Sequence, residues 1–141
     1  MSDLWIEDVG VEGIDVSGDY AVQISRAKVQ RTGAACYKSN LSQSFQTEIE
    51  RQQIEDLDLS EPGRAGGTPI GLYLLRGSFT FRRVRVAGSA LGVLVQGAID
   101  TRLEGAELVR NEVGMDLSAV TDDLPLLTGV HFEDNTTNLR E

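Results

Sequence analysis

A repeat of 22 residues restricts the fold of this chain more than any other feature of its sequence. The segment Phe79–Val95 is followed by a related segment, Thr101–Leu117, and a third match ends at Leu139 after a step of 24 residues. A period of about 20 to 50 residues is typical of proteins built from stacked repeats. The matched apolar residues stand two apart, as in a β-strand whose side chains point alternately inward and outward. We therefore expect a solenoid made of β-strands.

The same pattern extends toward the N-terminus and yields six repeat units. Apolar residues occupy relative positions 1, 3, 6 and 8 of each unit, and a further short strand follows a bend. In this register, Ile6–Val11 and Ile54–Leu59 both align with Phe81–Val86. Three short strands per turn predict an all-β fold, a right-handed parallel β-helix of about six coils. The units begin near Leu4, Val22, Gln52, Phe79, Thr101 and Pro125.

The outward-facing positions support this register through their charges. Equivalent residues of stacked coils lie about 4.8 Å apart, so opposite charges at one position favour the pairing. Charge signs alternate from coil to coil along three rows. Position 4 holds Glu7, Ser25, Glu55, Arg82, Glu104 and Thr128; position 5 holds Asp8, Arg26, Asp56, Arg83, Gly105 and Gly129; position 7 holds Gly10, Lys28, Asp58, Arg85, Glu107 and His131.

The composition is that of one globular domain, with 141 residues, 40% hydrophobic and 25% charged. The net charge of −9 argues against binding to nucleic acid or to an anionic membrane surface. Cys36 is the sole cysteine, which excludes an intrachain disulfide and a cysteine-based metal cluster. The N-terminus has no signal-peptide pattern, and no apolar run approaches the roughly 20 residues of a membrane span.

Three insertions interrupt the period, at residues 38–51, 60–70 and 118–124. In the first, Leu41, Phe45 and Ile49 recur every four residues, which predicts a short helix over the stack. The coil pattern runs to Leu139 without an evident polar cap at either end, although solenoids need such caps. We expect residues 1–141 to form one β-helix domain that is a segment of a longer solenoid, or that buries its ends by association.

Adjacent carboxylates in the third insertion are the first candidates for chemistry. Asp122 and Asp123 lie there, with Asp116 and Asp100 nearby in the sequence. Clustered carboxylates bind calcium or act as an acid–base pair. The competing interpretation is a solvated acidic loop, because adjacent residues on a loop point apart.

The only basic cluster is Arg82, Arg83 and Arg85, and it has two interpretations. It could clamp a phosphate or carboxylate, or each arginine could pair with an acidic neighbour on the preceding coil, which the register favours. His131, the sole histidine, suggests catalysis or metal binding. It falls beside Glu107 in the register, however, where it could simply end the charge row, and no second His or Cys ligand accompanies it.

Other conspicuous residues have structural explanations. Ser89, Asn111 and Asn135, with Thr32 before them, occupy one bend of successive coils, where Asn tolerates bent backbone and bonds to its own kind. Cys36 aligns with Val93 and Met115 at an inward position, as a small buried hydrophobe. Trp5 points outward on the first coil and serves either as a sugar-stacking platform or as a site covered by preceding chain.

The repeats Phe79–Val95 and Thr101–Leu117, with Asn111 and Asn135 at the bend, resemble the right-handed parallel β-helix repeats of the pectate-lyase-like superfamily. The longer alternation through Ile54–Leu59 and Phe79–Val86 resembles uncharacterised β-helix repeat proteins of myxobacteria.

This resemblance implies the fold and, for superfamily members that act on polysaccharides, a secreted or surface location. Lyases of the superfamily hold calcium with aspartates and use an arginine or lysine as the base; its hydrolases carry Asn-Thr-Asp, Asp-Asp, Gly-His-Gly and Arg-Ile-Lys motifs. Here residues 135–137 read Asn-Thr-Thr, residues 129–131 read Gly-Val-His, Asp122-Asp123 falls in a loop, and no Arg-Ile-Lys occurs. No catalytic set can be transferred.

Two hypotheses for function follow. The first is a non-catalytic β-helix scaffold or binding module of a secreted or cell-surface protein, with a polysaccharide or protein partner. The second is a polysaccharide lyase or hydrolase domain whose catalytic set is incomplete in this segment. We expect no cofactor except calcium at Asp122 and Asp123, no nucleic-acid partner and no membrane insertion, and we consider end-to-end self-association a third outcome.

Overall fold

The computed structural model describes residues 2–18, 22–41, 52–63, 66, 68–97, 100–120 and 124–141, and these residues form strands and connecting turns without an α-helix. The strands belong to two parallel sheets, here named sheet A and sheet B. Sheet A contains β1 (Ser2–Glu7), β3 (Gln23–Gln30), β5 (Gln52–Ser60), β7 (Phe79–Ala87), β9 (Arg102–Glu104), β10 (Glu107–Val109), β12 (Leu126–Thr128) and β13 (His131–Glu133). Sheet B contains β2 (Ile14–Gly18), β4 (Tyr37–Leu41), β6 (Ile70–Arg76), β8 (Leu91–Val95), β11 (Val113–Asp116) and β14 (Thr137–Arg140).

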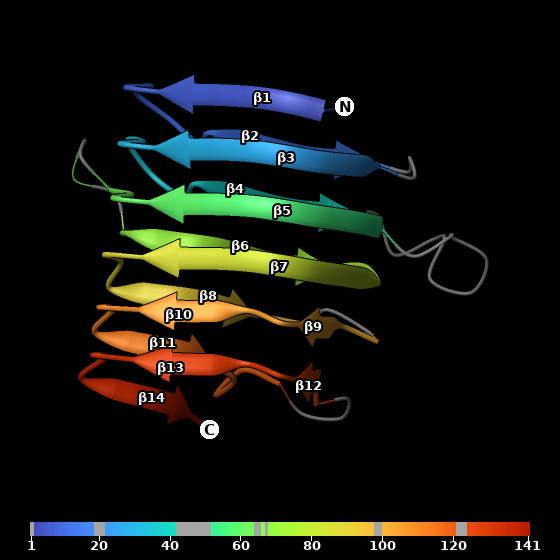
Figure 1. Ribbon diagram of the computed structural model, residues 1–141, viewed down its shortest axis with the longest axis vertical. Helices are drawn as coiled ribbons and strands as arrows, with labels where there is room; N and C mark the ends of the chain where they lie inside the picture. The colour runs from blue at the N-terminus through green and yellow to red at the C-terminus, as the bar shows by residue number, and fades with distance from the viewer. Residues whose placement is uncertain are drawn as a thin grey trace.

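The chain alternates between the two sheets and climbs one strand per turn, which makes it a β-solenoid. In Figure 1 the sheet A strands run to the left in front, the sheet B strands return to the right behind them, and the chain descends, so the winding is right-handed. One row of sheet A shows the repeat directly: Trp5, Lys28, Asp58, Arg85, Glu107 and His131, separated by 23, 30, 27, 22 and 24 residues. Six stacked strands, related by five turns, confirm the predicted parallel β-helix.

The core fills the interior between the two sheets, and the predicted inward positions form it. On β7, Phe81, Val84 and Val86 are at most 1% exposed, and on β5 the matching residues are equally buried. Tyr37 of β4 meets the ring of Phe81 edge-on, with ring centroids 5.8 Å apart. Each such side chain contributes about 1.5–3 kcal/mol through removal of apolar surface from water.

Two bends in every coil are made by residues in the left-handed backbone region. The first row comprises Asp3, Arg26, Asp56, Arg83, Gly105 and Gly129; the second comprises Asp8, Arg31, Glu61, Gly88, Arg110 and Asp134. All twelve φ angles lie between 51° and 68°. A non-glycine residue in this region costs about 1–2 kcal/mol, so the row of bends is imposed by the stack. The bend lets two consecutive side chains face outward, as the sequence pattern predicts.

The expected register of the first coil was wrong by five residues. Trp5, Asp3 and Ser2 continue the rows in which the sequence pattern predicts Gly10, Asp8 and Glu7. The apolar pair Leu4 and Ile6 fits relative positions 1 and 3 or 6 and 8 equally well, because the two pairs have the same spacing. The length of the connection from sheet A to sheet B decides between these two alignments. Ile6 precedes Ile14 by eight residues, and on the next coil Val29 precedes Tyr37 by the same number. In sheet A, the other five coils keep the predicted register.

The strands of the structure show where each predicted insertion begins and ends. Strand β4 extends to Leu41, so residues 38–41 continue sheet B instead of belonging to the first insertion. The short helix expected from Phe45 and Ile49 lies outside the described residues. The second interval falls between the end of β5 at Ser60 and the start of β6 at Ile70, and the third falls between β11 and β12.

Candidate functional site

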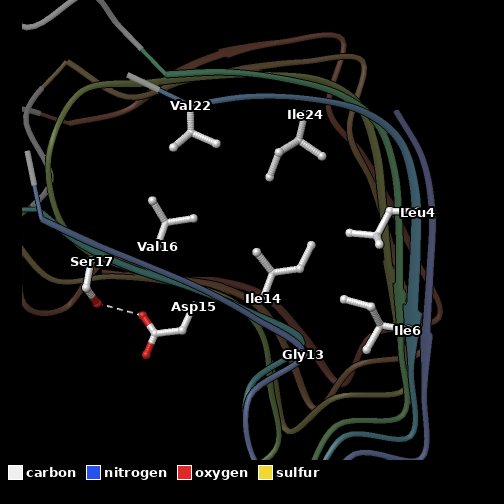
Figure 2. A pocket seen from close by; sticks show the side chains of 9 residues that line it. All are labelled: Leu4, Ile6, Gly13, Ile14, Asp15, Val16, Ser17, Val22 and Ile24. Atoms are coloured by element: carbon white, nitrogen blue, oxygen red, sulfur yellow. Dashed lines mark hydrogen bonds between the residues drawn. The ribbon is translucent and has the colours of Figure 1, made fainter. Parts of the chain in front are cut away.

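The N-terminal end of the solenoid contains an apolar hollow of about 500 Å³. Figure 2 shows that three walls of the first two coils point their side chains into it. Leu4 and Ile6 come from β1, Ile14 and Val16 from β2, and Val22 and Ile24 from the start of the second coil, while Gly13, Asp15 and Ser17 complete the lining.

The hollow is the end of the solenoid interior. Side chains fill this interior in the following coils, but at the first coil it is open on one side. Leu4 and Ile6 occupy the rows of Leu57 and Leu59, which are 1% and 0% exposed. Leu4 and Ile6 are only partly buried, because β1 and β2 are the terminal strands of sheets A and B in the described structure. The backbone edge of β1 and the apolar hollow therefore face the same direction.

The outer surface of the first coil carries two acid–arginine pairs and one aromatic ring. Asp3 accepts hydrogen bonds from Arg26 on the next coil, at 2.6 and 2.8 Å, and this contact holds the pKa of the Asp3 carboxyl below its usual value. Asp8 is bound in the same way by Arg31, at 2.8 and 3.0 Å. Trp5 is 67% exposed between them, with the ammonium of Lys28 5.7 Å from its ring.

A second hollow, of about 340 Å³, lies on the outer face of sheet B. Ala35, Ile70 and Leu94 form its buried apolar floor, and Leu91 and Tyr73 pack against them. At its rim, Lys38 donates to Glu12 at 3.1 Å, and the Tyr73 hydroxyl donates to Gln96 at 2.7 Å. The remaining lining residues are Ala34 and Thr68. Sequence analysis missed this hollow, because Leu94 and Ile70 face outward from a sheet whose outer positions are mostly polar.

The candidate calcium residues Asp122 and Asp123 lie outside the described residues, so calcium binding there remains a prediction. The two aspartates expected near them have other partners. Asp116 is 3% exposed, accepts hydrogen bonds from the amide and hydroxyl of Ser118, and forms an ion pair with Arg140. These contacts, with Arg140 the strongest, lower the pKa of Asp116 to about 2. Asp100 lies 3.5 Å from Arg102. The described part of the chain contains no cluster of three or more His, Cys, Asp or Glu side chains suited to a metal ion.

The three clustered arginines are members of the charge rows, as the register predicted. Arg82 lies 3.3 Å from Glu55 and 2.7 Å from Glu104, on the coils before and after it. Arg83 and Arg85 reach the preceding coil in the same way, to Asp56 at 2.6 Å and Asp58 at 3.3 Å. The carboxylates on the neighbouring coils therefore compensate this positive charge.

His131 occupies the row that the sequence predicted, next to Glu107. Its side chain is 66% exposed, and its Nε2 lies 3.7 Å from the carboxylate of Glu133 in the same strand. This contact lies on the exposed surface of the solenoid.

The polar bend residues form the predicted ladder. The amide of Ser89 donates to the side-chain oxygen of Asn111 at 3.0 Å, and the amide of Asn111 donates to that of Asn135 at 2.8 Å. Thr32 lies at the same bend of the second coil and is fully buried.

Cys36 is buried as predicted, but its row is different. Tyr37 aligns with Val93 and Met115, while Cys36 falls in the row of Gly71 and Gly92, because the corner of the second coil contains one additional residue. Its sulfur lies 3.4 Å from the carbonyl oxygen of Ser60 and 3.7 Å from the Thr32 hydroxyl. Burial raises the pKa of the Cys36 thiol to about 11.

Comparison with known proteins assigns this chain to no family. The chain matches no family model, no curated protein and no solved structure at a significant level. The architecture defines the class of protein, a parallel β-solenoid, and the likeness to the pectate-lyase-like superfamily remains a resemblance of repeat pattern. None of the described segments forms a helix with the length and apolarity needed to cross a membrane.

Proposed function

We propose that this protein is a non-catalytic β-solenoid binding module that accepts an extended strand of a partner protein on its N-terminal coil. The observation that carries the proposal is the coincidence of an apolar hollow with the edge of a terminal parallel strand, β1. A peptide strand that pairs with a sheet edge gains affinity from main-chain hydrogen bonds and specificity from alternate side chains placed in pockets. Here alternate side chains of an added strand would stack on Leu4 and Ile6.

Trp5 makes this function measurable. It is the sole tryptophan, it lies on β1, and its ring is 67% exposed, so its emission should shift when a strand covers the edge. We expect an extended peptide with two alternate valines to bind and to change Trp5 emission. Ile6→Asp should abolish the change, because it places a charge in the apolar hollow.

The matched control is Leu126→Asp, which places the same charge at an exposed leucine of the C-terminal coil. This variant should bind the peptide as the unaltered protein does. Equal loss in both variants, or no emission change with any peptide, would refute a strand-accepting N-terminal end.

The second hollow favours a second candidate, recognition of a glycan on sheet B. An aromatic ring beside a carboxylate and an ammonium, as in Tyr73, Glu12 and Lys38, offers a stacking face and polar groups for sugar hydroxyls. A secreted or cell-surface location, implied by the superfamily resemblance, belongs to this proposal.

A panel of acidic and neutral polysaccharides, with and without calcium, tests this candidate. Binding that Tyr73→Ala removes would support glycan recognition. Calcium-dependent release of sugar products would instead support the alternative, a polysaccharide lyase or hydrolase, and would make Asp122 and Asp123 the first residues to substitute.

A further inference from the structure

We infer that the sugar recognised in the second hollow is an amino sugar whose free, protonated amine lies beside Glu12. This inference rests on the glycan-binding candidate proposed above and specifies the chemical class of the glycan. It follows from the charges at the rim of the hollow, from the position of Tyr73 and from the apolar floor.

Two outward-facing rows of sheet B line the second hollow. One row contains Ile70 and Leu91, and the other contains Lys38, Tyr73 and Leu94. Neighbouring members of a row come from successive coils and stand about 4.8 Å apart, so the hollow extends along the axis of the solenoid. Its volume of about 340 Å³ is at the small end for ligand-binding clefts, which favours a short segment of a glycan over a long one.

Three charged groups stand together at the rim, and two of them are acids. Glu12 and Lys38 line the hollow, and Asp15 is the neighbour of Lys38 in sheet B. The ammonium of Lys38 lies 3.1 Å from the Glu12 carboxylate and 3.6 Å from the Asp15 carboxylate. One positive and two negative charges leave an excess of one negative charge. A ligand with a positive group therefore completes the balance at this rim, whereas a ligand with a carboxylate increases the excess.

Glu12 is the acid that a ligand in the hollow can reach. Its side chain is 27% exposed and lines the hollow, while Asp15 remains beside Lys38 and keeps that ammonium compensated. A carboxylate accepts several hydrogen bonds, and a protonated amine has three N–H groups to donate. The amine of a sugar can therefore bind Glu12 without leaving Lys38 unpaired.

Tyr73 supplies the surface on which the ring of the sugar lies. Its hydroxyl donates a hydrogen bond of 2.7 Å to Gln96, which fixes the outer end of the aromatic ring. Within its row, Tyr73 stands between Lys38 and Leu94, so it connects the charged rim with the apolar floor. The C–H face of a sugar ring packs on such apolar surface, and the polar groups at the edge of the ring need polar partners.

Calorimetric titration at pH 6 and low salt tests the inference with four β-1,4-linked tetrasaccharides, made of glucosamine, N-acetylglucosamine, glucose or glucuronate. We expect the glucosamine tetramer to bind about 3- to 10-fold more tightly than the glucose tetramer, which corresponds to one partly exposed ion pair. The N-acetylated tetramer should lose this advantage, because its amide carries no charge. Added salt should reduce the preference, and the glucuronate tetramer should bind most weakly.

Substitutions assign the effect to the rim of the hollow. Glu12→Gln should remove the preference for glucosamine over glucose, whereas Lys38→Gln should increase it, because the ligand then meets two uncompensated carboxylates. The matched control is Glu133→Gln, which removes the same charge from an exposed position of sheet A and should leave the preference unchanged. Circular dichroism and melting of each variant establish that the fold persists.

The outcomes separate this inference from the candidate function on which it rests. Equal binding of the glucosamine and glucose tetramers, lost for both in Tyr73→Ala, would overturn the amine while leaving glycan recognition in the hollow. A preference that survives in Glu12→Gln, or that falls equally in Glu133→Gln, would reveal a general attraction to an acidic protein and would also overturn it. Tightest binding of the glucuronate tetramer, or a weaker preference in Lys38→Gln, would have the same consequence. Absence of binding by all four tetramers would overturn both the amine and the glycan-binding candidate.

Discussion

The backbone amide of Ser89 donates a hydrogen bond of 3.0 Å to the side chain of Asn111, 22 residues later and one coil below. The side-chain nitrogen Nδ2 of Asn111 donates to the carbonyl oxygen of Val86 at 3.2 Å, so this one side chain satisfies two buried backbone groups of the preceding coil. The ladder therefore stabilises a corner where the backbone has left the regular strand pairing.

Asn111→Ala should reduce the free energy of unfolding by about 2–4 kcal/mol, because it leaves the buried amide of Ser89 and the buried carbonyl of Val86 without partners. Chemical denaturation measures this loss. Asn135→Ala, at the more exposed last coil, should cost less. Equal stability of Asn111→Ala and the unaltered protein would contradict a structural role for the ladder.

Leu103→Ala should cost about 2–5 kcal/mol of unfolding free energy, because Leu103 is fully buried between Phe81 and Leu127 of the neighbouring coils. Arg85→Ala should cost less than about 1 kcal/mol, because Arg85 is a partly exposed member of a charge row. Urea denaturation of both variants gives the ranking, and the reverse order would contradict the core described above.

Asp116→Asn should lower the free energy of unfolding at neutral pH, and this loss should be smaller in acid. Arg140 and Ser118 hold the pKa of Asp116 at about 2, below its ordinary value of 3.8. A group with a lowered folded-state pKa stabilises the protein above its unfolded pKa and loses that contribution as the pH falls toward the folded one.

The loss for Asp116→Asn should therefore be about 1–3 kcal/mol at pH 7 and roughly half of that at pH 3. Denaturation curves of both proteins at pH 7, 4 and 3 measure the difference. A difference that grows as the pH falls would show that the Asp116–Arg140 pair has the opposite effect.

Cys36 should resist thiol reagents in the folded protein. Its side chain is fully buried, and burial raises the pKa of the thiol to about 11, so little thiolate exists at pH 8. Reaction with a disulfide reagent should be slow in buffer and complete after unfolding in guanidinium. Rapid modification of the folded protein would show that the corner of the second coil opens readily.

Much of the fold follows from local pattern because the alternation of side chains in a strand is a local property. The inward row through Ile54, Phe81 and Leu103 and the charge row through Asp58, Arg85 and Glu107 were both predicted from spacing. The candidate site was not predicted from spacing. Its residues Leu4, Ile6, Ile14 and Val16 have the same apolar pattern as any core position, and only the stacking order shows that they line an open end.

The sequence by itself determined the solenoid, its period, its inward and outward faces and the pairing of most charges, since each depends on residue spacing along one strand. The tertiary structure alone decided the register of the first coil, the neighbours of Cys36 and the burial of Asp116 against Arg140. These features depend on how many residues connect one sheet to the other and on which strands become neighbours. The apolar pattern of the sequence is compatible with more than one such arrangement. The open N-terminal end belongs with them, because a core position is closed or open according to the coil stacked upon it.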